Sequence, residues 1–287
     1  MPLSAPTAGR LTVVDHSRAS SGMTYVYPVV SRRAGGVSVG INLNPNQACN
    51  WRCIYCQVPD LKRGGPPPID LQRLESELRE LLGSLFHGDY LERHVPPEAR
   101  RVVDIAFSGD GEPTSAAEFP AAVEIVGRVL DELKLTAPPR LRLITNGSLL
   151  NRKYVQNGIS ALGARQGEVW FKIDAVDPEL MRRINSVAYR PASVLRRLQA
   201  CGSRCETWVQ TCVFVCDGTV SWDTGADAYL ELLMQAGSSI AGVYLYGLAR
   251  PSTQPEAARL QALPAEHMQA IARRIQKATG LTVRVSP

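Results

Sequence analysis

The stretch CNWRCIYC (residues 49–56) places Cys49, Cys53 and Cys56 at the spacing C-x3-C-x2-C, with Tyr55 before the last cysteine. Thiolates gathered this closely are typical ligands of soft metals and iron–sulfur clusters. A tetrahedral zinc site or a fully ligated four-iron cluster needs four protein ligands, yet the next histidine is His87, beyond a Gly/Pro-rich loop and a predicted helix. Three thiolates would therefore hold a four-iron cluster with one iron open to another ligand.

The composition around this motif is that of a globular protein. The chain has 287 residues, 45% of them hydrophobic and 21% charged. No apolar run reaches the length of a membrane span, and residues 1–4 lack a signal-peptide pattern, so we expect no membrane association. Seven cysteines without an export signal predict reduced thiols in a cytoplasmic protein. The net charge of +5 is compatible with an anionic partner such as RNA.

Hydrophobic periodicity predicts a strand followed by a helix six times, and then a terminal strand. The predicted strands lie at residues 37–43, 101–107, 140–144, 168–173, 207–215, 240–246 and 281–285. The predicted helices lie at residues 70–85, 119–133, 151–162, 192–200, 223–235 and 264–278, with a shorter one after Asp177. This alternation predicts an α/β fold with a parallel sheet, and both a partial (β/α)6 barrel and a doubly wound open sheet fit it. We expect residues 1–24 to form a partly disordered arm and residues 25–287 one domain.

Ligands of such folds bind at the carboxyl ends of the strands. The polar and glycine-rich residues of this chain gather at those ends. The cysteine stretch follows the first strand. The next ends carry, in order, Gly109-Asp110-Gly111-Glu112-Pro113, Thr145-Asn146, Asp174 and, on the sixth strand, Tyr246. The sequence therefore predicts a binding site at this edge of the sheet.

The cysteine stretch resembles the signature of the radical S-adenosylmethionine (SAM) enzymes, and residues 108–114 resemble their "GGE" element. The resemblance implies a partial TIM-like barrel, a [4Fe-4S] cluster held by the three cysteines, and SAM on the open iron. It also implies a reductant such as flavodoxin or ferredoxin, and reductive cleavage of SAM into methionine and a 5′-deoxyadenosyl radical. Glu112 would accept from the SAM amino group and Asp174 from a ribose hydroxyl. The residues expected around SAM are Tyr55, Gly109, Asp110, Gly111, Glu112, Pro113, Thr145, Asn146, Asp174, Gln210 and Tyr246.

Within this superfamily the chain is similar to the tRNA wyosine (4-demethylwyosine) synthases. The similarity rests on residues 31–33, 55–57, 107–114, 145–150, 170–175, 210–211 and 246–251. It implies a tRNA base as substrate. Two departures leave open whether the substrate is an RNA base or a small molecule. No cysteine precedes Cys49 to form the second cluster of those synthases, and an Ile-Asn-Arg-Pro-like run is stretched over residues 184–191.

Three further residues are candidates for substrate contact. Lys172 shares one strand face with Trp170 and Asp174, and if that face looks into the barrel, Lys172 points there too. A buried lysine needs a partner or a task; it could pair structurally, bind the SAM carboxylate, bind a substrate anion or form a Schiff base. Arg250 and Cys216 are the other two. We expect Cys201, Cys205 and Cys212 to be small buried hydrophobic residues.

Two other functions remain open from the sequence. A glycyl-radical-enzyme activase would be a similarly compact radical SAM chain, and would install a radical on a partner protein. A zinc-stabilised RNA-binding module would use the same cysteines without catalysis, but it leaves residues 109–113 and Asp174 unexplained. We expect the protein to be a monomer.

Overall fold

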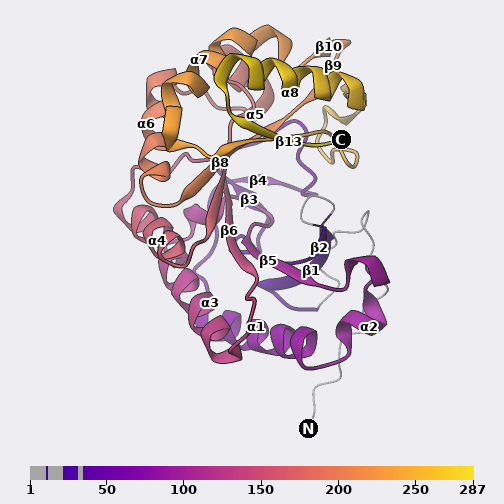
Figure 1. Ribbon diagram of the computed structural model, residues 1–287, viewed down its shortest axis with the longest axis vertical. Helices are drawn as coiled ribbons and strands as arrows, with labels where there is room; N and C mark the ends of the chain where they lie inside the picture. Colours follow the sequence, from indigo (N-terminus) through magenta and orange to yellow (C-terminus); the bar gives the residue numbers. More distant parts are fainter. Residues whose placement is uncertain (1–10, 12–21, 32–34) are drawn as a thin grey trace.

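The computed structural model describes residue 11, residues 22–31 and residues 35–287, and strands alternate with helices along it (Figure 1). The strands are β1 (Val26–Ser31), β2 (Gly36–Ile41), β3 (Ala48–Cys49), β4 (Lys62–Arg63), β5 (Val102–Phe107), β6 (Arg140–Thr145), β7 (Glu168–Lys172), β8 (Glu206–Cys212), β9 (Phe214–Cys216), β10 (Thr219–Val220), β11 (Gly242–Tyr246), β12 (Leu260–Ala262) and β13 (Thr282–Ser286). The helices are α1 (Leu71–Phe86), α2 (Tyr90–His94), α3 (Phe119–Leu133), α4 (Lys153–Ala164), α5 (Pro178–Asn185), α6 (Pro191–Gly202), α7 (Ala226–Ala236) and α8 (Ala265–Thr279). Short 3-10 helices lie at Pro97–Ala99, Pro113–Ser115, Asp223–Gly225, Gly237–Ser239 and Ala257–Arg259.

One curled sheet organises the fold. Its strand order, β1-β2-β5-β6-β7-β8-β11-β13, follows the sequence without reversal. Every pair from β2 to β13 is parallel, as the six predicted strand–helix repeats and terminal strand require. A doubly wound sheet would reverse its order in the middle. The prediction of a partial TIM-like barrel is confirmed, with β1 added as an antiparallel edge strand that the sequence pattern did not predict.

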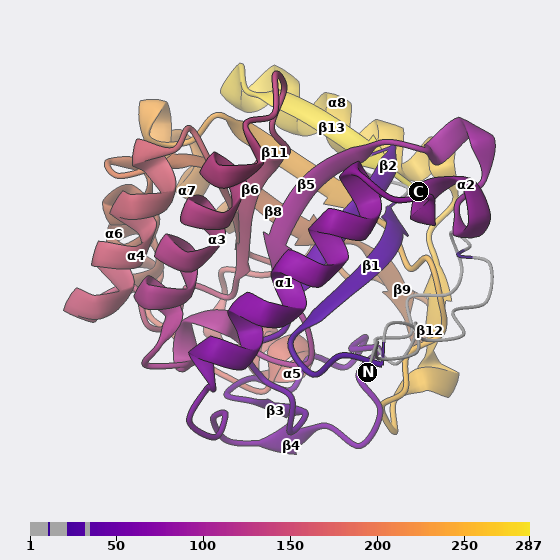
Figure 2. The same ribbon diagram turned by 90° about the horizontal axis from the view of Figure 1, so that it is seen from below.

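Helices α1, α3, α4, α6, α7 and α8 cover the outer face of the curled sheet (Figures 1 and 2), whereas α5 packs against the cysteine stretch. Neighbouring helices pack in sequence order, as α1 on α3, α3 on α4, α6 on α7 and α7 on α8. Residues alternate across each strand, so Val169 and Phe171 of β7 join this outer core while Trp170 and Lys172 face inward. None of the helices in the described residues combines the length and apolarity needed to cross a membrane.

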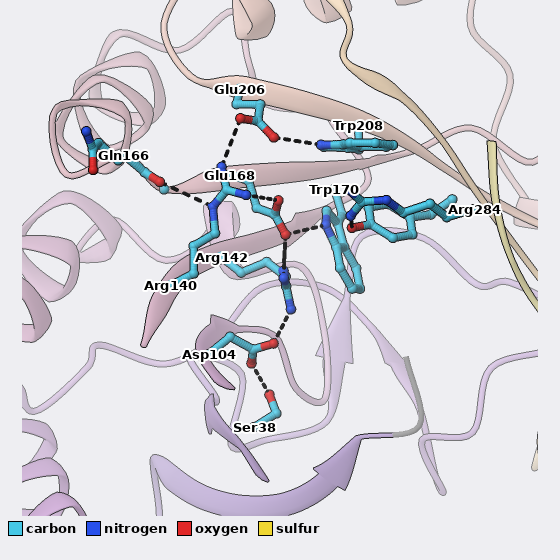
Figure 3. A network of polar contacts seen from close by, with 12 residues as sticks. Ser38, Asp104, Arg140, Arg142, Gln166, Glu168, Trp170, Glu206, Trp208 and Arg284 are labelled. Atoms are coloured by element: carbon cyan, nitrogen blue, oxygen red, sulfur yellow. Dashed lines mark hydrogen bonds and ion pairs between the residues drawn. The ribbon is translucent and has the colours of Figure 1, made fainter. Parts of the chain in front are cut away.

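The inner face of the sheet is polar at its amino end (Figure 3). Arg142 lies between two buried carboxylates, contacting Asp104 and, at 2.5 Å, Glu168. Its guanidinium carbon lies 4.1 Å from the Trp170 ring centroid. Arg140 adds an ion pair to Glu168 at 2.9 Å. Charged side chains, instead of the branched aliphatic layers common in such barrels, therefore fill this end of the interior.

One predicted strand needs correction, and the predicted N-terminal arm lies mostly outside the described residues. The single strand predicted at residues 207–215 breaks at Val213: β8 ends at Cys212, and β9 joins a separate small sheet with β10 and β12. The predicted arm, residues 1–24, lies mostly outside the described residues, as do Arg32 and Arg33. Leu11, which is described, is buried and its amide donates to the His94 carbonyl at 2.8 Å.

Candidate active site

Hydrogen bonds from several parts of the chain hold the cysteine stretch in place. β3, which ends at Cys49, pairs in parallel with β4. The amides of Arg52 and Ile54 donate to the carbonyls of Asn185 and Ile184, at 3.2 and 2.9 Å, so the end of α5 supports the middle of the stretch. Ser252 Oγ donates to Ile54 O at 2.7 Å on the other side. The three thiols therefore sit on a fixed backbone.

All three cysteines line one cavity of about 200 Å³, which we call the cysteine cavity. Residues from the ends of β5, β6 and β7 complete it. The predicted site residues that line it are Cys49, Cys53, Cys56, Gly109, Asp110, Gly111, Glu112, Thr145, Asn146 and Lys172. A Cβ on Gly111 would lie 2.1 Å from the Ala48 carbonyl oxygen, so only glycine lets this turn pack against the cysteine stretch.

The thiols have the surroundings that iron–sulfur ligands need. Burial raises the pKa of both Cys49 and Cys53 to about 12, so each thiol keeps its proton until a bound metal displaces it into solvent. Two N–H groups already point at the sulfurs, from Trp51 N to Cys49 Sγ at 3.4 Å and from Asn185 Nδ2 to Cys53 Sγ at 3.2 Å. Within the described residues, no three Cys, His, Asp or Glu side chains are placed to hold a single metal ion; the thiols line a cavity wall instead. This donor set fits a cluster.

Glu112 links the ends of two strands. Its Oε1 accepts from the Thr114 amide at 3.1 Å and from the hydroxyls of Thr114 and Thr145, both at 2.6 Å. Its Oε2 accepts from the Asn146 amide at 2.7 Å. Burial raises the pKa of Glu112, and the bonds from Asn146, Thr114 and Thr145 oppose that shift. The carboxylate therefore fixes the turn after β5 against the end of β6, with Oε2 the less used oxygen.

Asp174 is the centre of a second buried group. Its Oδ2 accepts from the Tyr55 hydroxyl and from Asn185 Nδ2 at 2.8 Å, and its Oδ1 accepts from the Cys212 amide at 3.0 Å. Lys172 Nζ lies 3.7 Å from Oδ2. Asp174 itself lines a small neighbouring cavity, not the cysteine cavity.

Lys172 carries a positive charge into the cysteine cavity. Its Nζ donates to the Tyr246 hydroxyl at 2.9 Å and lies 4.6 Å from the centroid of the Tyr55 ring. Burial alone would lower the pKa of Lys172, but Asp174 and Tyr246 outweigh it and raise the pKa well above its ordinary value. The structure thus pairs Lys172 with Asp174, one of the options that the strand face left open.

Several predicted residues lie elsewhere. Arg250 lines a cavity of about 220 Å³ inside the barrel, which shares Ser108 and Gly109 with the cysteine cavity. Cys216 lines a cavity of about 430 Å³ beside β9, because β9 has left the main sheet. The residues predicted around SAM that do not line the cysteine cavity are Tyr55, Pro113, Asp174, Gln210 and Tyr246. Cys201, Cys205 and Cys212 are buried, as predicted.

Sequence reasoning missed a set of asparagines around the cysteine stretch. Asn42 Nδ2 donates to Asp110 Oδ2 at 2.6 Å, Asn146 Nδ2 donates to Asn50 Oδ1 at 2.8 Å, and Asn185 bridges Cys53 and Asp174. Asn50 lies inside the motif and Asn42 lies next to the end of the predicted first strand, so their positions were a usable signal. The role of Asn185 depends on where α5 packs, which no local pattern reveals.

Comparison with known proteins bears on this arrangement directly. The family profile described as the radical SAM superfamily matches residues 43–223, which include the cysteine stretch and the ends of β5 to β8. The chain belongs to the radical SAM superfamily. This family implies a [4Fe-4S] cluster and SAM as cofactors.

Two curated relatives of this radical SAM protein are similar over part of their length. A UPF0026 protein of Methanocaldococcus jannaschii is 33% identical over 159 residues, covering 55% of this chain and 42% of its own length. A UPF0026 protein of Helicobacter pylori strain J99 is 28% identical over 160 residues, covering 55% of this chain and 44% of its own. The matched segments thus span less than half the length of each relative.

Solved structures share the fold. TYW1, in a structure with a lysine-pyruvate adduct bound, superposes with a TM-score of 0.53 at 14% identity, covering 84% of this chain and 73% of that one. Streptococcus suis SuiB bound to S-adenosylmethionine gives a TM-score of 0.55 at 10% identity, covering 88% of this chain and 47% of that one. At these identities the likeness concerns the fold, and it agrees with the partial barrel described above.

Proposed function

We propose that this radical SAM enzyme acts on a base in RNA, with its cofactors seated in the cysteine cavity. Cys49, Cys53 and Cys56 would hold the [4Fe-4S] cluster, which supplies the electron that splits SAM into methionine and a 5′-deoxyadenosyl radical. The observation that carries this assignment is the cavity itself, because the three thiols, the glycine turn and Asn146 line it together. We also propose that residues 25–287 form a single domain around it.

The remaining predicted residues would support SAM from around the cavity. Glu112 Oε2, which accepts only from the Asn146 amide, is placed to accept from the SAM amino group as well. Tyr55 belongs to the cysteine stretch and donates to Asp174. Gln210 and Tyr246 lie on the neighbouring strands β8 and β11. We propose that these four side chains contact SAM on the side of the cysteine cavity where Lys172 lies. Asp174 would lie nearest the ribose.

Two exposed cations at the mouth of the cavity support an RNA substrate. Lys62 and Arg63 form β4, which pairs with β3 at Ala48 and Cys49, and their side chains are exposed. Leu61, the preceding residue, lines the cysteine cavity. Cations placed beside a pocket attract a phosphate backbone and deliver an unstacked base to the pocket. The sequence similarity to the wyosine synthases and the fold shared with TYW1 point the same way.

The RNA proposal predicts a charge-dependent effect at this rim. Arg63→Glu is expected to weaken RNA binding about tenfold at moderate salt, and to reduce the slope of log affinity against log salt by about one, because one phosphate contact is lost. RNA binding is measured by fluorescence anisotropy across a salt series. Arg93→Glu is the matched control, because α2 lies at the opposite end of the molecule from β4 (Figure 2). Equal effects of the two variants would contradict an RNA site at the rim.

A second experiment separates substrate classes. The anaerobic, reduced enzyme is given SAM and cell extract that has been fractionated into RNA, protein and small-molecule pools. Release of 5′-deoxyadenosine is expected to accelerate with the RNA pool, and nuclease treatment should remove the effect. Stimulation by the protein pool alone would support the activase function, and stimulation by the small-molecule pool alone would contradict an RNA substrate.

We further propose that Lys172 binds a carboxylate group as an ammonium ion. Its position beside Asp174 and against two tyrosine rings favours the charged form. Formation of a Schiff base, by contrast, would require the neutral amine. The ammonium instead suits the carboxylate of SAM or of a substrate that enters the cysteine cavity.

Lys172 variants distinguish these chemistries. Lys172→Met is expected to weaken SAM or substrate binding about tenfold or more, since a charge-assisted hydrogen bond is lost, while Lys172→Arg should retain part of it. Borohydride added with pyruvate is expected to leave the mass of the Lys172 peptide unchanged in mass spectrometry. A covalent mass gain at Lys172 that disappears without pyruvate would show that the residue forms a Schiff base.

A further inference from the structure

Asn185 is a buried residue whose side-chain amide contacts both a motif cysteine, Cys53, and the buried acid Asp174. It is the last residue of α5 and is 1% exposed. Its Nδ2 donates to Asp174 Oδ2 at 2.8 Å and to Cys53 Sγ at 3.2 Å. Because the carboxylate of Asp174 only accepts, the nitrogen end of the amide must face this side, and both of its hydrogens are used.

The backbone around Asn185 fixes this placement. Its carbonyl accepts from the Arg52 amide at 3.2 Å, and Ser186 Oγ donates to the Arg52 carbonyl at 2.9 Å. Asn185 Oδ1 is buried, and the described residues offer it no hydrogen-bond partner. The amide is thus held by its nitrogen end alone, between one of the three cysteines and the acid at the end of β7.

An N–H donor has a defined effect on a sulfur that ligates iron. Reduction adds negative charge to the cluster and its thiolates, and a donor at the sulfur stabilises that charge. Hydrogen bonds to the sulfurs are accordingly among the factors that set the reduction potential of iron–sulfur clusters. Of the two N–H groups that point at cysteine sulfurs here, the one on Cys49 comes from the backbone, so Asn185 supplies the one that side-chain substitution can remove.

We propose that Asn185 is a positioning residue that raises the reduction potential of the cluster through its bond to Cys53, and that holds Cys53 in register with Asp174. The inference rests on the proposed function, because it requires Cys53 to ligate the cluster. Loss of the amide makes the cluster harder to reduce, so fewer clusters carry the electron that SAM cleavage needs.

The test is a redox titration of the anaerobically purified holoenzyme, followed by electron paramagnetic resonance of the reduced cluster. Asn185→Leu keeps the side-chain size and removes both donated bonds. At a fixed solution potential its ratio of reduced to oxidised cluster is expected to fall about tenfold, a shift of about 59 mV to more negative potential for one electron. An unchanged midpoint in a variant with full cluster content would overturn the inference.

Substitution of the neighbouring residue distinguishes an effect on the reduction potential of the cluster from an effect on the position of the cysteine stretch. Ser186→Gly removes the hydroxyl bond to the Arg52 carbonyl, and glycine suits the positive φ of 56° at this position. It touches neither the sulfur nor Asp174, so its midpoint is expected to match that of the wild type. An equal shift in both variants would mean that the end of α5 acts only by holding the loop, which overturns the role of the amide.

A measurement on the unsubstituted enzyme covers the case in which Asn185→Leu does not fold. Protein labelled with 15N-asparagine is expected to show a weak 15N hyperfine coupling to the reduced cluster in pulsed electron paramagnetic resonance. Absence of that coupling would overturn the inference. If the wild type binds no [4Fe-4S] cluster at all, the proposed function fails first, and iron and sulfide analysis identifies that outcome before any variant is compared.

Discussion

Cys53→Ala is expected to abolish both the iron–sulfur cluster and the cleavage of SAM. Anaerobically purified wild-type protein should contain about four irons per chain, and the variant close to none. Cys53 is the central cysteine of the motif, and it lies between the end of α5 and Lys172 on the wall of the cysteine cavity. Two thiolates alone leave a second iron without a protein ligand. Iron and sulfide analysis, visible absorbance and 5′-deoxyadenosine release measure the loss.

Cys205→Ala provides the matched control for this loss. Cys205 is also buried, but it precedes β8 at the amino end of the sheet, where its thiol donates to the Gly167 carbonyl at 3.3 Å. Its replacement is expected to leave the iron content and the rate of 5′-deoxyadenosine release nearly unchanged. If the cluster were lost in Cys205→Ala and retained in Cys53→Ala, the assignment of the motif cysteines as ligands would be wrong.

Arg142→Met is expected to lower the free energy of unfolding by about 3–5 kcal/mol, the effect of removing one partner from a buried ion pair. The guanidinium lies between Asp104 and Glu168, whose side chains are each 1% exposed, and over the ring of Trp170 (Figure 3). Methionine replaces the side-chain volume but leaves two buried carboxylates without this cation. Equilibrium unfolding in urea, followed by circular dichroism, measures the change.

An exposed arginine shows what burial contributes to this effect. Arg128 pairs with Glu75 at 2.6 Å on the helical surface, where its side chain is 53% exposed. Arg128→Met is expected to change the free energy of unfolding by less than about 1 kcal/mol, because water screens the pair. Arg142→Met combined with Asp104→Asn and Glu168→Gln should recover part of the lost stability. If Arg142→Met alone lowered the free energy of unfolding by less than about 1 kcal/mol, the buried ion pairs would contribute less to stability than expected here.

The strand–helix order and the position of the site were predictable because they depend on local pattern and on one geometric rule. Each predicted repeat has its own periodicity, and the carboxyl ends of parallel strands meet at one edge of the sheet. For this reason the three motif cysteines, residues 109–112 and Asn146 were expected together, and they line one cavity. The same alternation correctly placed Lys172 and Trp170 on one shared face of β7, and the structure shows that this is the inner face.

Where the pattern failed, the cause lies in contacts between distant residues. The segment from 207 to 215 contains no glycine, proline or other turn residue, so nothing in it marks the break at Val213. The break exists because Phe214–Cys216 pairs with β10 and with β12, some forty residues further along. Cys216 is the last residue of β9 and so belongs to this small sheet. It lines a cavity separate from the one that the three motif cysteines share.

The sequence by itself determined that three thiols at fixed spacing precede a glycine turn within a wound parallel sheet, because motif spacing and strand period are local properties of the chain. Only the tertiary structure decided which groups those thiols meet. The Asp174 carboxylate accepts hydrogen bonds from Tyr55, Asn185 and the Cys212 amide, and Lys172 donates one to the Tyr246 hydroxyl. These six residues come from five separate segments, and packing of α5 and the curled sheet brings them together.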